Sequence, residues 1–264
     1  MLLREVEYAK PASVAEALEL LASNDGARAL AGGQTVINVM KARAASPDML
    51  VDLNGLEELR GIELAGDGTL TIGAMTTYTE LMASAEAKAR PILGEVCSTI
   101  ADVQVRNRGT IGGNVCSNDP TNHLPPLMVA VGATMTVLGA GVERAVPAEE
   151  FFLGVYMTAV GPGELLTKIS IPAGKKDGFA AVTLGAEGTC IANAAATVNG
   201  SVRVALGCVD AVPVVVTADS PDGVADAVRG AGLEPPSDVH ASAEYRLHLA
   251  QVLATRAAEE AAAR

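Results

Sequence analysis

TIGGNVCSNDP, residues 110–120, sets two adjacent glycines behind a β-branched pair and follows them with small polar residues up to Pro120. A second double glycine lies in AGGQTVI, residues 31–37. Glycine accepts positive φ and lets a ligand approach with no Cβ in the way, and consecutive exposed N–H groups form a concavity that binds anions, phosphates above all. One such segment is most often a tight turn. Two, each at the end of a strand or helix, favour a pyrophosphate held from both sides.

We call residues 31–36 the first glycine loop and residues 110–114 the second glycine segment. Small polar side chains stand in or beside both and can add hydrogen-bond donors: Gln34, Thr35, Thr110, Asn114 and Ser117. The usual phosphate motifs are absent, because the chain contains neither GxGxxG nor GxxxxGK followed by Ser or Thr. A dinucleotide bound by this chain therefore needs another architecture.

The composition narrows the class of protein. The chain has 264 residues, is 49% hydrophobic, lacks Trp and carries a net charge of −12, which argues against a broad nucleic-acid or anionic-membrane surface. No apolar run approaches membrane-spanning length, and the first residues do not read as a signal peptide, so we expect a cytoplasmic protein. The four cysteines form no CxxC pair, which predicts reduced thiols and no metal site made by this chain alone.

The local patterns predict an α+β chain in three parts, residues 1–56, 57–173 and 178–264. In the first part we expect strands and helices to alternate: a strand at 6–8, a capping box at Ser13–Glu16 before a helix that Gly26 ends, and strands at 27–31 and 49–53.

In the second part we expect a strand at 70–74, a capping box at Thr77–Glu80, and one helix after Pro91 with Ile92, Val96, Ile100 and Val103 on one face. Further segments read as mostly strand-like: 127–131, 134–138, 142–146 and 165–171.

Residues 174–178 are a linker by composition. The third part reads as an antiparallel meander over 179–184, 191–198, 202–209 and 212–217, with a hairpin turn at Asn199-Gly200. Two helices, at 224–228 and 245–262, should close the chain, the last with a core stripe of Leu249, Val252 and Leu253 and an exposed Ala/Glu-rich end.

Longer stretches of the chain carry a family resemblance: residues 31–62, 70–81, 106–133, 165–172 and 242–257. Together they resemble the FAD-binding medium subunit of molybdenum hydroxylases, the family of carbon monoxide dehydrogenase and the xanthine dehydrogenase type. The resemblance implies two α+β FAD-binding subdomains of the vanillyl-alcohol oxidase type and a smaller C-terminal α+β domain.

The resemblance also implies site residues. The FAD pyrophosphate would lie on the backbone of Ala31, Gly32, Gly33, Gln34, Thr35 and Val36 and of Thr110, Ile111, Gly112, Gly113 and Asn114. Ser117 would lie close to the cofactor and Leu166 would line the ring pocket.

Two positions depart from the family pattern. His123 stands where the family often has an acidic residue that contacts the cofactor; it could still donate a hydrogen bond, or it could be a surface loop residue. After the linker the family often shows a Lys and an Arg, whereas residues 179–185 contain no base. A cation near flavin can stabilise its reduced anion, so this absence leaves the electron acceptor open.

Three of the four charged residues near these motifs allow two interpretations. Arg106 and Arg108 are either solvated or face the cofactor or a partner protein. Asp119 either accepts a bond within its loop or shapes a turn, and Lys168 reads as an exposed strand residue.

The function implied by the resemblance is electron transfer within a dehydrogenase complex. A large subunit would carry molybdopterin, a small subunit two [2Fe-2S] clusters, and this chain would pass their electrons through FAD to an external acceptor, as part of a dimer of heterotrimers. We find no acid–base pair for substrate chemistry, so no catalytic residue is predicted. The alternatives are a stand-alone flavin oxidoreductase of the same fold and an assembly module without flavin.

Overall fold

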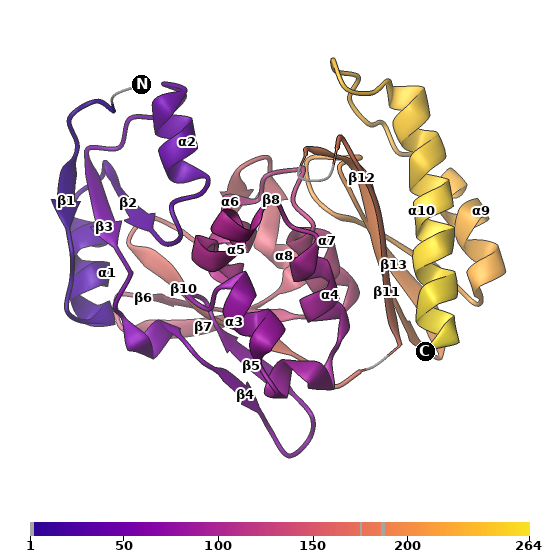
Figure 1. Cartoon of the computed structure of the whole chain (residues 1–264), viewed down its shortest axis with the longest axis horizontal. Helices are drawn as coiled ribbons and strands as arrows, with labels where there is room; N and C mark the ends of the chain where they lie inside the picture. Colours follow the sequence, from indigo (N-terminus) through magenta and orange to yellow (C-terminus); the bar gives the residue numbers. More distant parts are fainter. Residues whose placement is uncertain (1–2, 175, 186–187) are drawn as a thin grey trace.

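The structure is a computed structural model and describes residues 3–174, 176–185 and 188–264. Three main sheets follow one another along the chain, and Figure 1 shows them from the indigo N-terminal part, through the magenta middle part, to the orange and yellow C-terminal part. The expected α+β class is confirmed. The exact boundaries at residues 56, 57, 173 and 178 stay a prediction.

The first part is a small parallel sheet with two helices. Its elements are β1 (Glu7–Ala9), α1 (Val14–Ser23), β2 (Ala27–Leu30), α2 (Val36–Lys41) and β3 (Met49–Asp52). The strand order is β1-β3-β2, with both pairs parallel. This order puts the carboxyl ends of β2 and β3 side by side, and the first glycine loop leaves that edge.

Helix α1 begins with half of the expected capping box. The Ser13 hydroxyl accepts from the Glu16 N–H at 3.2 Å, but the Glu16 carboxylate accepts from the N–H of Ala12 at 2.7 Å instead of that of Ser13. The helix ends at Ser23 rather than at Gly26, because the Asn24 side chain donates to the Leu20 carbonyl at 2.8 Å.

The middle part is an antiparallel five-stranded sheet in the order β4-β5-β10-β6-β7. Its strands are β4 (Ile62–Leu64), β5 (Leu70–Gly73), β6 (Thr134–Gly139), β7 (Val142–Pro147) and β10 (Glu164–Ile171). Packed with it are η1 (Glu57–Leu59), α3 (Tyr78–Ala83), η2 (Glu86–Ala89), α4 (Ile92–Ser98), α5 (Val103–Arg108), α6 (Ile111–Ser117), α7 (Leu124–Ala130) and α8 (Ala148–Phe151), and a hairpin of β8 (Phe152–Gly154) and β9 (Met157–Thr158). Most of these elements share one core, whereas Leu59 of η1 and Leu165 of β10 pack in the core of the first part.

Two predictions for the middle part are wrong. The helix after Pro91 breaks into α4 and α5, because Ala101 takes φ 44 and Asp102 caps a new helix by accepting from the Val105 N–H at 2.7 Å. Residues 127–131 are not a strand; 127–130 belong to α7 and Val131 is its C-cap. Pro125 and Pro126 fit the first turn of this helix, because N–H groups there have no acceptor within the helix and their absence costs no hydrogen bond. The capping box at Thr77 is confirmed in full.

The third part confirms the antiparallel meander in chain order: β11 (Asp177–Thr183), β12 (Cys190–Asn199), β13 (Ser201–Gly207) and β14 (Val214–Ala218). Gly200 takes φ 79 in the predicted hairpin turn. The strand β11 begins inside the predicted linker, at Asp177, while Lys175 lies outside the described residues.

Helices η3 (Pro221–Gly223), α9 (Val224–Gly230) and α10 (Ala243–Ala263) complete this part, and Figure 1 shows α10 lying along the last sheet. The prediction that the Ala/Glu-rich end of α10 is exposed is wrong for one face of the helix, because Ala257, Ala258 and Ala261 are fully buried. A Cβ on Gly178 would stand 2.1 Å from the Ala257 carbonyl oxygen. The small residues therefore let helix and strand approach closely.

Candidate functional site

The first glycine loop presents an unbroken row of unpaired donors. Gly33 takes φ 74 between β2 and α2, and the backbone N–H groups of residues 31–36 donate no hydrogen bond to any described part of the chain. Six successive donors of this kind are what an anion-binding loop requires. Gln34 does not compete for them, because its side-chain amide donates to the Gly32 carbonyl at 3.0 Å.

A polar chain at the end of β3 holds this loop. The Asn54 side chain donates to the Ala31 carbonyl at 2.9 Å and to the Asp52 carboxylate at 2.7 Å, and the Asn54 N–H donates to the same carboxylate at 2.9 Å. The Tyr8 hydroxyl donates to the other Asp52 oxygen. Burial raises the pKa of Asp52, but these hydrogen bonds together lower it by more than burial raises it. The pKa of Asp52 therefore lies below its usual range.

Sequence reasoning missed these residues. The available signal was that Asp52 ends, and Asn54 follows, a strand parallel to the one that leads into the glycine loop.

The two glycine segments lie against each other. A Cβ on Gly32 would stand 2.1 Å from the carbonyl oxygen of Arg108, and a Cβ on Gly113 would stand 3.5 Å from the Ala31 Cβ. The structure therefore brings together the two motifs that the sequence separates by more than seventy residues.

The second glycine segment is the cap and first turn of α6, and its donors are engaged. The N–H groups of Ile111 and Gly112 donate to the carbonyls of Thr76 and Ala74, both at 2.9 Å. Those of Gly113 and Asn114 donate to the hydroxyl and carbonyl of Thr110, both at 3.0 Å. A Cβ on Gly112 would stand 2.5 Å from the Ala74 oxygen. The second glycine segment thus offers backbone without a Cβ that other groups can approach closely, whereas the first glycine loop offers the free N–H groups.

Behind α6 the polar residues form a network. The Ser117 hydroxyl donates to the Asn114 carbonyl at 2.8 Å, and the Asn122 side chain donates to the same carbonyl at 3.2 Å and to the Ser117 hydroxyl at 3.1 Å. The Asn114 amide donates to the Tyr78 hydroxyl at 2.9 Å, while its Oδ1 is buried without a partner in the described structure. An orphaned acceptor here fits a ligand that brings its own donor.

His123 is not a surface residue. It is 9% exposed, stands just before α7, and its ring centroid lies 5.3 Å from that of Phe179 on β11. Burial lowers the pKa of His123, so the ring is neutral at pH 7. Leu166, on β10, is 4% exposed and packs in the core of the middle part. The roles of both toward a cofactor stay predictions.

The charged residues near the two glycine segments differ in the contacts that their side chains make. Arg106 donates to the backbone carbonyls of Ile100 and Ala101, so it holds the α4–α5 connection. Arg108 is exposed and has no hydrogen bond or ion pair within the described residues. The Asp119 carboxylate accepts from the Thr121 N–H at 2.9 Å and hydroxyl at 2.8 Å within its turn, and from the Tyr156 hydroxyl at 3.1 Å outside it. Lys168 is a half-exposed strand residue 3.6 Å from Glu143.

The described residues contain neither a membrane-spanning helix nor a cluster of metal ligands. No described helix is long and apolar enough to cross a membrane. Among the residues described, no three or more His, Cys, Asp or Glu side chains gather as metal ligands would.

The chain matches known proteins over its whole length. Residues 4–174 match the family described as FAD binding domain in molybdopterin dehydrogenase. The carbon monoxide dehydrogenase medium chain of Hydrogenophaga pseudoflava is 46% identical over 169 residues, which span 63% of this chain and 58% of that one. That of Afipia carboxidovorans is 38% identical over 98% of this chain and 97% of its own.

A solved structure shares the fold from end to end. Carbon monoxide dehydrogenase from Hydrogenophaga pseudoflava, lacking the Mo-pyranopterin moiety of the molybdenum cofactor, superposes with a TM-score of 0.90 at 36% identity, covering 100% of this chain and 99% of that one. The relatives are dehydrogenase subunits, and the free donors of the first glycine loop agree with a bound anionic cofactor. The chain belongs to the family of FAD-binding domains of molybdopterin dehydrogenases.

Proposed function

We propose that this chain is the electron-transfer subunit of a molybdenum hydroxylase, in which FAD receives electrons from [2Fe-2S] clusters of a small subunit and passes them to an external acceptor. A large subunit with molybdopterin would oxidise the substrate, and the whole would form a cytoplasmic dimer of heterotrimers. The observation that carries the proposal is the row of free N–H groups over residues 31–36, placed against the second glycine segment.

The proposed binding site uses backbone more than side chains. The N–H groups of the first glycine loop would hold the FAD pyrophosphate, and the close packing at Gly112 and Gly113 would keep that side free of Cβ atoms. Asn114 and Ser117 would supply polar contacts beyond the phosphates. FAD supplies the redox chemistry when bound, while this chain binds it, orients it and sets its electrostatic surroundings.

An exposed apolar hairpin beside α6 supports docking of a partner subunit. The β8–β9 hairpin leaves four large side chains 46–60% exposed: Leu153, Val155, Tyr156 and Met157. Tyr156 ties it to the end of α6, with its N–H 3.1 Å from the Asn118 carbonyl and its hydroxyl 3.1 Å from Asp119. Grouped apolar exposure of this kind marks interaction surfaces.

The test has two stages. The chain purified alone should bind FAD stoichiometrically, as read from the flavin spectrum, and should turn over no organic substrate. Co-expressed with its partner subunits, its flavin should bleach when substrate is added under anaerobic conditions. A chain that binds no flavin would be an assembly module, and rapid flavin reduction by substrate in the free chain would instead establish a stand-alone oxidoreductase.

A further inference from the structure

Two of the four cysteines lie together at one end of the third sheet. The strands β12 and β13 pair Asn193 with Gly207, and both Cys190 and Cys208 lie on the same side of that pair. The Nδ2 atom of Asn193 is 3.4 Å from the Cys190 sulfur and 3.5 Å from the Cys208 sulfur. The two sulfurs are therefore bridged by a single amide nitrogen on a fully buried side chain.

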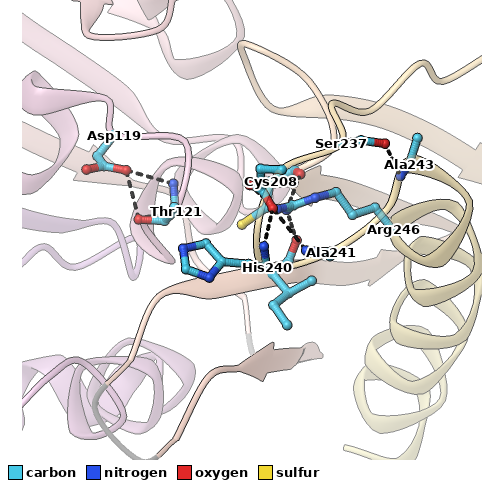
Figure 2. A network of polar contacts seen from close by, with 10 residues as sticks. Asp119, Thr121, Cys208, Ser237, His240, Ala241, Ala243 and Arg246 are labelled. Carbon is cyan, nitrogen blue, oxygen red and sulfur yellow. Dashed lines mark hydrogen bonds and ion pairs between the residues drawn. The ribbon is translucent and has the colours of Figure 1, made fainter.

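A buried cation stands beside this pair. Arg246, on α10, is 5% exposed, and its Nη1 donates to two backbone carbonyls. One belongs to Ile191, which follows Cys190, and the other belongs to Cys208 itself. Figure 2 shows Cys208 between the Arg246 guanidinium and the turn that contains Asp119 and Thr121. The Arg246 Nε and the Asn193 Oδ1 are buried without partners in the described structure, which is unusual for a site that serves packing alone.

The two thiols are polarised in opposite directions. The pKa of Cys190 is lowered, first by the Cys208 side chain and then by Asn193, the Ala192 backbone and Arg246, against the effect of burial. The pKa of Cys208 is raised, first by Cys190 and then by burial. Burial alone raises the pKa of Cys97 and of Cys116 to about 12. A thiolate is the nucleophile in thiol oxidation, so this pair differs in kind from the other two cysteines.

Cys208 lines a small cavity at the seam between the middle and third parts, together with Asn118, Asp119, Asn122 and Asp210. Its volume of about 10 Å³ is the room of one water molecule. Hydrogen peroxide has two oxygen atoms, so its approach to Cys190 requires a local opening of this seam. Cys208 also takes φ 65, a left-handed conformation that non-glycine residues adopt rarely.

We propose that Cys190 and Cys208 are a dithiol site that hydrogen peroxide converts reversibly into a disulfide. The Cys190 thiolate attacks one peroxide oxygen, so that an S–O bond forms, the O–O bond breaks and hydroxide leaves. The Cys208 sulfur then attacks the sulfenic sulfur of Cys190; the S–S bond forms, the S–O bond breaks and water leaves. Two thiols lose two electrons and two protons, and one peroxide becomes two waters.

The contacts bring the two sulfurs near each other, because each lies within 3.5 Å of the same Asn193 nitrogen. Cys190 lies three residues and Cys208 one residue from the Asn193–Gly207 pair, so the two cysteines are diagonal rather than directly opposite neighbours. The bond therefore requires the Asn193 amide to move aside and the backbone at the end of β13 to adjust.

The experiment uses the full chain, reduced, freed of reductant and exposed to hydrogen peroxide. Remaining thiols are then alkylated in denaturant and the protein is digested without reduction for mass spectrometry. We expect one peptide pair linking Cys190 to Cys208, lighter than the sum of its peptides by two hydrogen atoms and restored to free thiols by dithiothreitol. In Cys208→Ser, Cys190 should instead be trapped by dimedone as a sulfenic acid.

The matched controls are Cys97→Ser, in which the link should form at the wild-type rate, and Cys190→Ser, in which Cys208 should stay alkylatable. Circular dichroism of each variant shows that it is folded before the reaction is scored. Recovery of both Cys190 and Cys208 as free thiols from the wild-type chain, after peroxide has oxidised its exposed methionines, would overturn the proposal. So would a link that involves Cys97 or Cys116.

Discussion

Arg90 and Asp177 form a two-point ion pair that joins the middle part of the chain to the third. The Arg90 Nε lies 2.8 Å from one Asp177 oxygen and its Nη2 lies 2.8 Å from the other. The two side chains are 5% and 0% exposed. Arg90 also donates to the Pro172 carbonyl, so it holds the chain where it passes from one part to the next.

Removing one member of this pair should destabilise the protein strongly. Arg90→Ala leaves a buried carboxylate without a partner, which costs about 3–5 kcal/mol, measured as the free energy of unfolding in urea. The control Arg229→Ala removes an exposed pair with Asp226 and should cost about 1 kcal/mol or less. Equal effects of the two variants would show that the Arg90 pair does not join the parts.

Gly32 should tolerate no side chain, and the reason is its neighbour. Gly32→Ala brings a Cβ to within 2.1 Å of the Arg108 carbonyl oxygen, so the two glycine segments must separate. We expect loss of FAD retention after gel filtration together with a lower melting temperature. Gly66→Ala, where no atom lies within 4 Å of the added Cβ, is the control and should retain flavin as the wild type does.

Asn54 should position the first glycine loop without touching the cofactor. Asn54→Ala removes the hydrogen bond to the Ala31 carbonyl, and a lost bond of about 1 kcal/mol weakens FAD binding about fivefold. Titration of the apoprotein with FAD measures this change. Asn24→Ala removes a comparable side-chain-to-backbone bond at the end of α1 and should leave the FAD dissociation constant unchanged.

His123 should make stability depend on pH in a narrow window. Burial lowers its pKa below the ordinary 6.5, so below pH 6.5 the unfolded chain binds a proton that the folded chain does not. The His123 contribution is therefore constant above that pH and is lost as the pH falls below it, by at most about 1.4 kcal/mol per pH unit. Unfolding free energies of wild type and His123→Gln, compared at about pH 7.5 and about pH 5.5, should converge at the lower pH; a constant difference would contradict the assignment.

Arg108 should matter for assembly and Arg106 for the fold. Arg108→Glu changes an exposed side chain beside the glycine segments, so we expect an unchanged melting temperature but weaker co-purification with the partner subunits, most clearly at low salt where charges are least screened. Arg106→Glu should lower the melting temperature, because it removes the bonds to the Ile100 and Ala101 carbonyls. Unchanged assembly with Arg108→Glu would remove this residue from the docking surface.

Local sequence signals predicted what depends on local structure. The meander of the third part and the loop between β2 and α2 were predictable because alternation, turn residues and glycines act over a few positions. The segment 127–131 was not, since a short apolar run fits a buried helix as well as a strand. The Asn54 contact and the engaged N–H groups of Ile111 and Gly112 depend on chain segments distant in sequence, which no local pattern encodes.

The hydrogen-bond donors of the first glycine loop are backbone N–H groups, so they do not depend on which side chains the loop carries. The exposed side chain of Thr35 makes no hydrogen bond within the described structure, so a randomised library at this position should give many functional clones. Gly32 should give almost none, because its neighbour is backbone that cannot be exchanged. The backbone conformation of this loop is therefore constrained, whereas the identity of its exposed side chains can vary.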